Sequence, residues 1–356
     1  MISTIRELIG ADTVFDLTLT VLIVVIAVLL VITIILGLAV LLLRYKNYLT
    51  ARRLNRLEDQ WSALIFTAID SGTGELPAQT IKRNRQRLFL QYLMRYARRL
   101  QGEEFAIIRQ LAQPYLPILL ERSWHENPED RARSLQIIGR FGFQDYSDYL
   151  VDALDDQSPM IVMIAAAALA GTKYPQYINP ILAAIAHFEQ WNVSYLAALL
   201  ARFGPEGAES LRRTLIDATA PLHIRIAGAA ALATIRDLSA GDLALDLLLK
   251  TADPELQAAA LRLLQTVGRQ THLAGIRQFA TAPEFMVRAN ACAALGRIGT
   301  DTDIDYLRRG LDDPSNWVAF HAAHGLLNLG DRTTLQNVAE SAHARSELAR
   351  QILAEN

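Results

Sequence analysis

A pattern with a period of 31 to 32 residues runs through the chain from about residue 125 to residue 340. One apolar position recurs in each unit, and its successive members are 31, 31, 32, 32, 31 and 31 residues apart. These anchor positions are Ile138, Leu169, Leu200, Leu232, Leu264, Leu295 and Leu326. A unit of this length cannot bury its apolar face alone, so stacked neighbours must close the core. The spacing therefore predicts an all-α array of about seven repeats.

The residues around each anchor predict two helices per repeat. Small residues shortly before the anchor, such as Ala322 and Ala323, let neighbouring helices approach closely. A bulky residue stands three positions after the anchor and is often followed by glycine, which is expected to end the first helix in the left-handed conformation. These glycines are Gly142, Gly204, Gly268, Gly299 and Gly330. A second helix and an Asp-rich, Pro-containing turn follow, as in Asp312–Ser315, where Asp and Ser favour the cap of the next helix.

The best-formed unit, Val287–Gly299, reads VRANACAALGRIG. It resembles the HEAT-like repeat of the bilin-lyase-type subclass, whose pattern is roughly V-R-x-x-A-A-x-A-L-G-x-I-G. The family's arginine is present as Arg131, Arg225 and Arg288 and is replaced elsewhere. The resemblance implies an α-solenoid in which this arginine pairs with turn aspartates of a neighbouring unit; a site for a partner's anion is the alternative. It implies little about function, because such folds host many functions.

The segment Leu17–Leu43 contains no charged side chain over 27 residues. About 20 apolar residues suffice to cross a bilayer as a helix. A signal peptide is the alternative, but its apolar core is typically about 7–15 residues long. The leader is also not basic, since Arg6 is outnumbered by Glu7, Asp12 and Asp16. The sequence therefore predicts a retained transmembrane helix over residues 17–43.

Basic residues follow this segment, and only Arg6 precedes it. They are Arg44, Lys46, Arg52, Arg53 and Arg56. Because positive charge stays on the cytoplasmic side, residues 1–16 are expected outside and the remainder in the cytoplasm, beneath the plasma (inner) membrane of a bacterium. The lone Cys292 agrees with a cytoplasmic location, since one cysteine forms no disulfide within a chain.

Charge divides the rest of the chain. Residues 44–99 carry 12 Lys and Arg against 4 Asp and Glu, whereas residues 100–356 carry 22 against 30. A helix over 45–70, a break at Ser71–Pro77 and a basic helix over Gln79–Leu100 are expected. The predicted domains are thus a basic juxtamembrane region at 44–102 and a solenoid at 103–356. The five basic residues above, with Arg83, Arg85 and Arg87, are predicted to face anionic lipid; the alternative is that the helix over 79–100 caps the array.

The sequence offers no catalytic motif, and no cofactor or metal is predicted. Phosphate-binding, zinc-protease and serine-hydrolase patterns are absent from it. His321 and His324 share one helical face, but a metal site would need further ligands. Cys292 occupies a small-residue packing position, which favours a core role over a nucleophile. The acidic pairs at the repeat turns are explained by capping.

One further column points to a binding surface. Nine residues before each anchor is about half a helical turn away from the core. Its non-acidic members are Met160, Trp191, His223, Met286 and Trp317. Trp and Met are enriched at protein interfaces, so these five are the candidate partner-binding residues. The alternative is that they pack under the preceding turn.

The function expected from these features is a non-enzymatic scaffold. Its solenoid would bind a protein partner that is itself membrane-associated, such as a membrane enzyme to which this chain is an accessory subunit. A bilin-lyase-like enzyme or chaperone acting on a chromophore protein is the second interpretation, suggested by the resemblance alone. Nucleic-acid binding ranks last, because such proteins carry basic stripes and the repeats are net acidic.

Overall fold

The computed structural model describes residues 11–74, 80–120, 127–142 and 145–355. The chain forms two compact units, Met1–Leu111 and Ala112–Asn356. Every regular element in the described residues is a helix.

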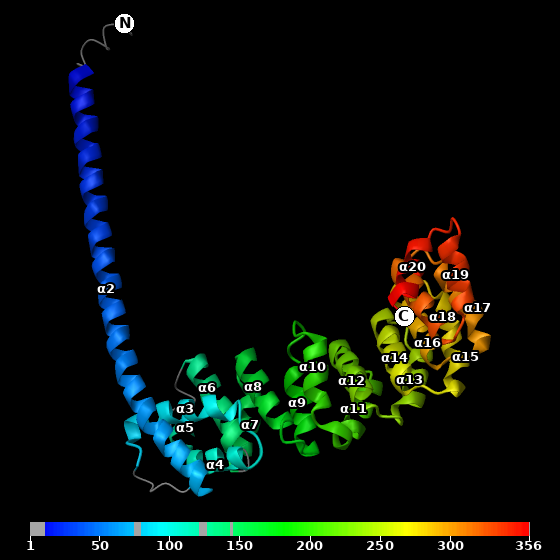
Figure 1. Cartoon of the computed structure of the whole chain (residues 1–356), viewed down its shortest axis with the longest axis horizontal. Helices are drawn as coiled ribbons and strands as arrows, with labels where there is room; N and C mark the ends of the chain where they lie inside the picture. The colour runs from blue at the N-terminus through cyan, green and yellow to red at the C-terminus, as the bar shows by residue number, and fades with distance from the viewer. Residues whose placement is uncertain (1–10, 75–79, 121–126, 143–144, 356) are drawn as a thin grey trace. The chain divides into compact units, whose positions relative to one another are not determined.

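The first unit is dominated by α2 (Ala11–Ser71), the long blue helix of Figure 1. Its segment Val21–Lys46 is long and apolar enough to cross a membrane and buries none of its surface in the protein. The helix continues without interruption through residues 45–70, so the helix predicted there is confirmed as an extension of the apolar one. Residues 1–10 and the side chain of Arg53 lie outside the described part of the chain.

A short 3-10 turn η1 (Arg83–Arg85) leads into α3 (Gln86–Ala97), and α4 (Gly102–Ala112) follows. The expected start of the basic helix at Gln79 lies outside the described residues, and the regular helix begins only at Gln86. α3 packs on α2 through Trp61, whose ring lies 5.5 Å from that of Phe89 and 5.6 Å from that of Tyr92. The predicted break after α2 is confirmed, since Gly72 leaves the helix with φ +68°.

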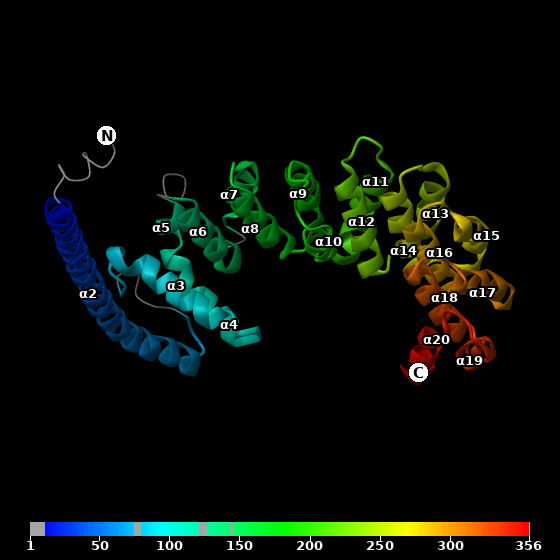
Figure 2. The same ribbon diagram turned by 90° about the horizontal axis from the view of Figure 1, so that it is seen from above.

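The second unit opens with η2 (Gln113–Tyr115) and α5 (Pro117–Leu120) and then repeats helical hairpins, drawn from cyan to red in Figure 2. The first helices of the hairpins are α6 (Pro128–Phe141), α8 (Pro159–Ala170), α10 (Val193–Ala201), α12 (Leu222–Ile235), α14 (Pro254–Val267), α16 (Phe285–Ile298) and α18 (Asn316–Asn328). The second helices are α7 (Ser147–Asp152), α9 (Ile178–Ile185), α11 (Ala208–Ile216), α13 (Ala240–Lys250), α15 (Leu273–Arg277), α17 (Ile304–Leu311) and α19 (Arg332–Glu340).

Short 3-10 turns flank several second helices. They are η3 (Ala153–Asp155), η4 (Pro175–Tyr177), η5 (Gly204–Gly207), η6 (Gln270–His272), η7 (Gln278–Thr281) and η8 (Asp301–Asp303). The final helix, α20 (Ser346–Glu355), packs on α19 and α18.

The anchors define the core of the solenoid. All seven are fully buried, and each lies in a different first helix. Each first helix packs against the next, from α6 to α18. Burying one such aliphatic side chain stabilises the fold by about 1.5–3 kcal/mol. The predicted period and the α-solenoid are therefore confirmed.

The glycines after the first helices behave less uniformly than expected. Gly204 and Gly330 have φ +63° and +84°, as a left-handed cap requires. The expectation is wrong for Gly142, Gly268 and Gly299, whose φ values are −114°, −66° and −71°. At Gly268 the N–H donates to the carbonyl oxygen of Leu264, and a Cβ would lie 2.3 Å from that oxygen. Glycine is needed there for close approach to the helix end, not for a positive φ.

Candidate partner-binding surface

The column nine residues before the anchor falls at the start of the first helices. Met160, His223, Met286 and Trp317 are each the second residue of their helix, in α8, α12, α16 and α18. Trp191 instead precedes Asn192, the residue that caps α10. Because consecutive first helices pack against one another, their opening turns follow each other along one edge of the solenoid.

These five candidates differ in exposure. Trp317 is 63% exposed and Met160 45%, whereas the other three are half-buried. Trp191 stacks on Phe188 of the preceding loop, with ring centroids 4.4 Å apart and planes 15° from parallel. At Trp191 the packing alternative therefore describes the side chain, while Trp317 and Met160 present large apolar surface to solvent.

Three exposed apolar residues adjoin this column and were not predicted from the sequence. Phe285 and Leu222 open α16 and α12, and Tyr195 lies in the first turn of α10; they are 48%, 36% and 49% exposed. The sequence did contain a signal for two of them. The first residue of α6, α8 and α14 is proline, whereas α12 and α16 begin with a large apolar residue. We call Met160, Tyr195, Leu222, Phe285 and Trp317 the first-helix apolar row.

Trp317 also begins an aromatic stripe along α18. Its ring stacks on His321 at 6.3 Å, and Phe320 packs edge-on against His324 at 4.5 Å. Burial, and to a smaller extent the neighbouring His324, lowers the pKa of His321. Positions 317, 320, 321 and 324 follow the i, i+3, i+4, i+7 rule for one helical face, a signal that could have identified Phe320. Within the described residues no three His, Cys, Asp or Glu side chains are grouped as metal ligands.

The arginine column makes structural contacts. Arg131 donates two hydrogen bonds of 3.2 Å to Asp156, and Arg288 donates bonds of 2.7 and 3.0 Å to Asp313. Each of these aspartates begins the next repeat, where it also accepts a backbone N–H two residues on, from Ser158 or Ser315. The carboxylates thus fasten one repeat to the turn of the next.

Arg225 makes a different contact. Its Nε donates to the carbonyl oxygen of Leu215 at 3.1 Å. Twenty-five residues after Arg225 stands Lys250, where Arg131 and Arg288 have their aspartates. The aspartate partner is therefore absent from the sequence at this junction.

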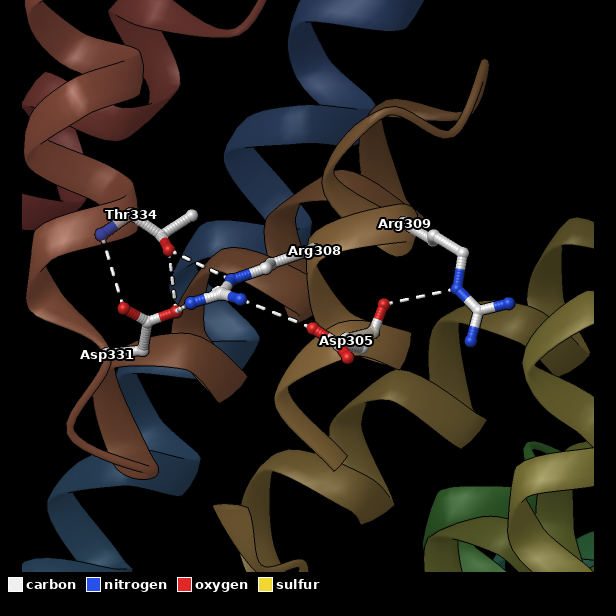
Figure 3. Close-up of polar contacts among 5 residues, drawn as sticks. All are labelled: Asp305, Arg308, Arg309, Asp331 and Thr334. Carbon is white, nitrogen blue, oxygen red and sulfur yellow. Dashed lines mark hydrogen bonds and ion pairs between the residues drawn. The ribbon is translucent and has the colours of Figure 1, made fainter. Parts of the chain in front are cut away.

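A second set of polar contacts joins the second helices of the last repeats. In Figure 3, Arg308 of α17 reaches Asp331 and Thr334 at the start of α19, with hydrogen bonds of 2.8–3.1 Å. Arg277 of α15 reaches Asp303 in the same way at 2.6 Å, and Asp242 of α13 pairs with His272 at 2.8 Å. We call these three contacts the polar seam.

Cys292 lies in the core. Its thiol is fully buried, and burial, with a smaller contribution from Asp313, raises its pKa to about 12. A thiol that stays protonated at neutral pH is a poor nucleophile. The small-residue packing role expected for Cys292 is the one that these surroundings favour.

The basic residues of the first unit vary in exposure. Those with exposed side chains are Arg44, Lys46, Arg52, Arg56, Arg83 and Arg85, and Arg87 is half-buried. Arg83 and Arg85 lie in η1, before α3 begins.

Comparison with known proteins adds a family. HEAT repeats match residues 114–199 and 241–327. No curated protein matches the chain.

Several solved structures are similar to the chain at low identity. A mutant of Kap121p is 13% identical, with TM-score 0.42, over 81% of this chain and 36% of its own. A designed armadillo repeat protein is 18% identical, with TM-score 0.31, over 60% and 100%. Human deoxyhypusine hydroxylase is 16% identical, with TM-score 0.31, over 77% and 97%. The chain spans about a third of the length of Kap121p.

The two matched segments contain five of the seven anchors, all of them buried between stacked hairpins of the described solenoid. The chain thus carries HEAT repeats over residues 114–199 and 241–327.

Proposed function

We propose that this protein is a non-catalytic, membrane-anchored scaffold whose first-helix apolar row binds a protein partner at the cytoplasmic face of the membrane. The observation that carries the proposal is the recurrence of exposed large apolar side chains at the start of five first helices, α8, α10, α12, α16 and α18, whereas α14 between them begins with Pro254 and Glu255. HEAT-repeat solenoids present extended surfaces of this kind. A row spanning several repeats suits an elongated segment of a partner.

The charge of the repeats defines the partner further. Residues 100–356 carry eight more acidic than basic residues. Complementary charge speeds encounter and rejects partners of the same sign. The partner is therefore expected to present apolar side chains flanked by Lys and Arg, a composition common in the cytoplasmic segments that follow transmembrane helices.

Helix α2 supports the membrane part of the proposal. From Val21 to Leu43 this helix has no charged side chain, and its apolar side chains from Val21 to Leu42 are exposed. Arg44, Lys46, Arg52 and Arg56 come after Leu43, and the positive-inside rule then places the part of the chain after the span in the cytoplasm. Binding at the row would thus be confined to partners at or near the same membrane.

Site-specific photo-crosslinking in cells tests the binding surface. A photoreactive phenylalanine analogue at position 317 or 285 should give a discrete adduct, and at position 238 it should give none. Leu238 is the matched control, because it is 66% exposed but lies outside the row. Replacing Met160 by Ser should weaken the adduct at 317, since both contact one partner. Equal adducts at 238 and 317, or none at either row position, would reject the surface.

The orientation is tested separately with Asp301→Cys, an exposed position of the solenoid. A membrane-impermeant maleimide should label it in inside-out vesicles and leave it unlabelled in intact cells. Cys292 provides a silent background, because it is buried and its pKa is raised to about 12. Labelling in intact cells would place the solenoid outside and overturn the proposed topology.

A further inference from the structure

A groove with a basic lining lies between α2 and the end of α3. Its volume is about 540 Å³. The residues that line it are Glu58, Tyr92, Arg95, Tyr96, Arg98, Arg99 and Leu100. Three guanidinium groups therefore face one carboxylate, which leaves a net charge of +2. Glu103 and Glu104 begin the next helix and do not line the groove.

One wall of the groove is held by its own contacts. The hydroxyl of Tyr92 donates to the backbone carbonyl oxygen of Glu58 at 3.1 Å and lies 3.1 Å from the hydroxyl of Tyr96. Arg95 donates to the Glu58 carboxylate, and its guanidinium lies 5.0 Å from the centre of the Tyr92 ring. Glu58 thus neutralises Arg95 and fixes its position.

Arg98 and Arg99 line the opposite side of the groove. Both side chains are exposed, and neither takes part in an ion pair within the described residues. They stand at the end of α3, where the main chain turns back through a hydrogen bond from the N–H of Arg99 to the carbonyl oxygen of Tyr96. Two adjacent unpaired guanidinium groups beside a concave surface are suited to an anion with several oxygens.

The direction of α3 decides where these arginines lie relative to the apolar span. Phe89 contacts Trp61, and Arg95 contacts Glu58, so α3 runs antiparallel to α2 and returns toward the span. Glu58 is 12 residues after Lys46, which is about 18 Å along the helix at 1.5 Å per residue. Arg98 and Arg99 follow Arg95 in the chain and so lie on the side of Arg95 that is nearer to the span.

Arginine side chains extend the reach further. They extend about 6–7 Å and keep their charged ends at polar interfaces. The headgroup layer adds about 6 Å beyond the hydrocarbon on each side. A membrane crossed by α2 therefore lies on the side of the groove toward which the end of α3, followed by Arg98 and Arg99, points.

The other end of α3 lies much farther away. Phe89 contacts Trp61, which follows Lys46 by 15 residues or about 22 Å along α2, and Arg85 comes four residues before Phe89. The antiparallel packing thus favours Arg98 and Arg99 over Arg83 and Arg85 as residues that meet lipid. The chain sequence alone could not distinguish the two ends.

We propose that the groove between α2 and α3 binds the phosphate of an anionic phospholipid headgroup, with Arg98 and Arg99 as its ligands and Arg95 as a fixed neighbouring charge. This inference rests on the proposed membrane anchoring. The first unit would then both cross the membrane through α2 and bind anionic lipid headgroups beside it.

Calorimetric titration of the full chain in neutral maltoside detergent tests the groove. The probes are dihexanoylphosphatidylglycerol, dihexanoylphosphatidylcholine and inorganic phosphate. The anionic lipid should bind more tightly than the other two. A basic residue near anionic lipid contributes about 1 kcal/mol, or roughly fivefold. R98Q/R99Q should therefore weaken phosphatidylglycerol binding about 20-fold.

R83Q/R85Q is the matched control, since it removes the same charge from exposed positions in η1, which precedes the other end of α3. It should change binding less than twofold. Equal losses in both double variants, or a wild-type chain that binds phosphatidylcholine equally well, would overturn the proposal. Inorganic phosphate binding as tightly as phosphatidylglycerol and lost in R98Q/R99Q would reject the lipid as its source.

Membrane anchoring by α2 is tested separately, by extraction of membranes with alkaline carbonate. Alkaline carbonate should leave the wild-type chain and both variants in the membrane fraction, because α2 is unchanged in all three. Release of the wild-type chain would contradict the proposed function, whatever the titration gives. Retention without phosphatidylglycerol binding would contradict the groove alone. Circular dichroism should show the same helix content in all three proteins.

Discussion

The first four repeats and the last three differ at one position, eight residues after the anchor. In the first four it is occupied by Tyr146, Tyr177, Ala208 and Ala240, and in the last three by His272, Asp303 and Thr334. The side chain is buried or half-buried in all seven. The polar members contact the second helix of the preceding repeat and form the polar seam.

The difference teaches what each kind of junction specifies. Apolar contacts tolerate small shifts of one helix against another, because dispersion and burial are not directional. A hydrogen-bonded pair fixes both distance and angle. Burying charge is costly, so such a pair adds little net stability, yet removing one partner leaves the other uncompensated. The last three repeats should therefore be held in one register and be the more sensitive to acid.

Acidification should separate the two regions most strongly. Burial alone would raise the pKa of Asp303, but hydrogen bonds from Arg277 and Thr300 outweigh it and lower the pKa below its ordinary value of 3.8. Burial would also raise the pKa of Asp331, but hydrogen bonds from Thr334 and Arg308 outweigh it and lower that pKa. A lowered folded pKa contributes stability above about pH 4 that is lost as pH falls through the folded value.

The measurement is urea denaturation at pH 7 and pH 3, followed by tryptophan fluorescence in two variants that each keep one tryptophan. Trp191 reports on the first repeats and Trp317 on the last. The Trp317 midpoint should fall more at pH 3. Asp217 in the first repeats also has a lowered pKa, owing mainly to hydrogen bonds from Thr219 in its own turn and least to Arg225 of the next repeat, but its side chain is exposed. Equal shifts of both midpoints would remove the proposed difference.

Removing the buried carboxylate should have the next largest effect. Asp303 has a fully buried side chain, and its removal leaves the guanidinium of Arg277 without its carboxylate partner. Asp303→Ala is expected to lower the free energy of unfolding by about 3 kcal/mol. Asp305→Ala is the control two residues further on, in the first turn of α17, because that side chain is 80% exposed, and it should cost less than about 0.5 kcal/mol. Similar costs for the two would mean that the seam is not a structural junction.

These junctions also mark how far sequence reasoning extends. The anchors recur in all seven repeats because every hairpin must bury the same face, so the period predicts both their burial and the fold. The polar seam occupies the same position in only three repeats, with three different residue types, so it forms no column in the sequence. Its partners lie 23 to 30 residues away and meet only when the hairpins stack.

The two tryptophans of the binding column lie in different surroundings for a local reason. Trp191 and Trp317 hold the same place relative to their anchors, but α10 begins at Val193, after the Asn192 cap. Trp191 therefore falls in the preceding loop and stacks on Phe188, whereas Trp317 lies on its helix in solvent. A shift of two residues in a helix start is enough to change a surface residue into a packed one, and such boundaries are poorly specified by sequence.

Two glycines in first helices, one in the last repeats and one in the first four, differ in how closely the neighbouring backbone approaches them. A Cβ on Gly296 of α16 would lie 2.2 Å from the Cα of Gly325 in α18, so the two backbones would have to separate. Gly296→Ala should destabilise the last repeats by about 2 kcal/mol. Gly228 of α12 has only the carbonyl oxygen of Leu211 at 3.7 Å, and Gly228→Ala should stabilise by about 0.5–1 kcal/mol through backbone entropy. Thermal unfolding of the two variants should therefore shift in opposite directions.

The arginine column tests the comparison with the smallest expected effect. Arg288 is 17% exposed, makes a two-bond contact with Asp313 and donates to the carbonyl oxygens of Ala282 and Pro283. Arg225 has one described hydrogen bond, to the neutral carbonyl of Leu215. Because charged partners make the stronger bonds, Arg288→Ala should cost about 1.5 kcal/mol and Arg225→Ala about 0.5 kcal/mol.

A double-mutant cycle with Asp313→Asn apportions the larger cost. The pair should couple by about 1 kcal/mol, since each single change already breaks the same two bonds. Arg225→Ala combined with Asp313→Asn should be additive, because the two residues lie in separate repeats and share no partner. Additivity in both cycles would mean that Arg288 stabilises by packing its aliphatic stem, and the junction between α16 and α18 would then depend on its apolar contacts.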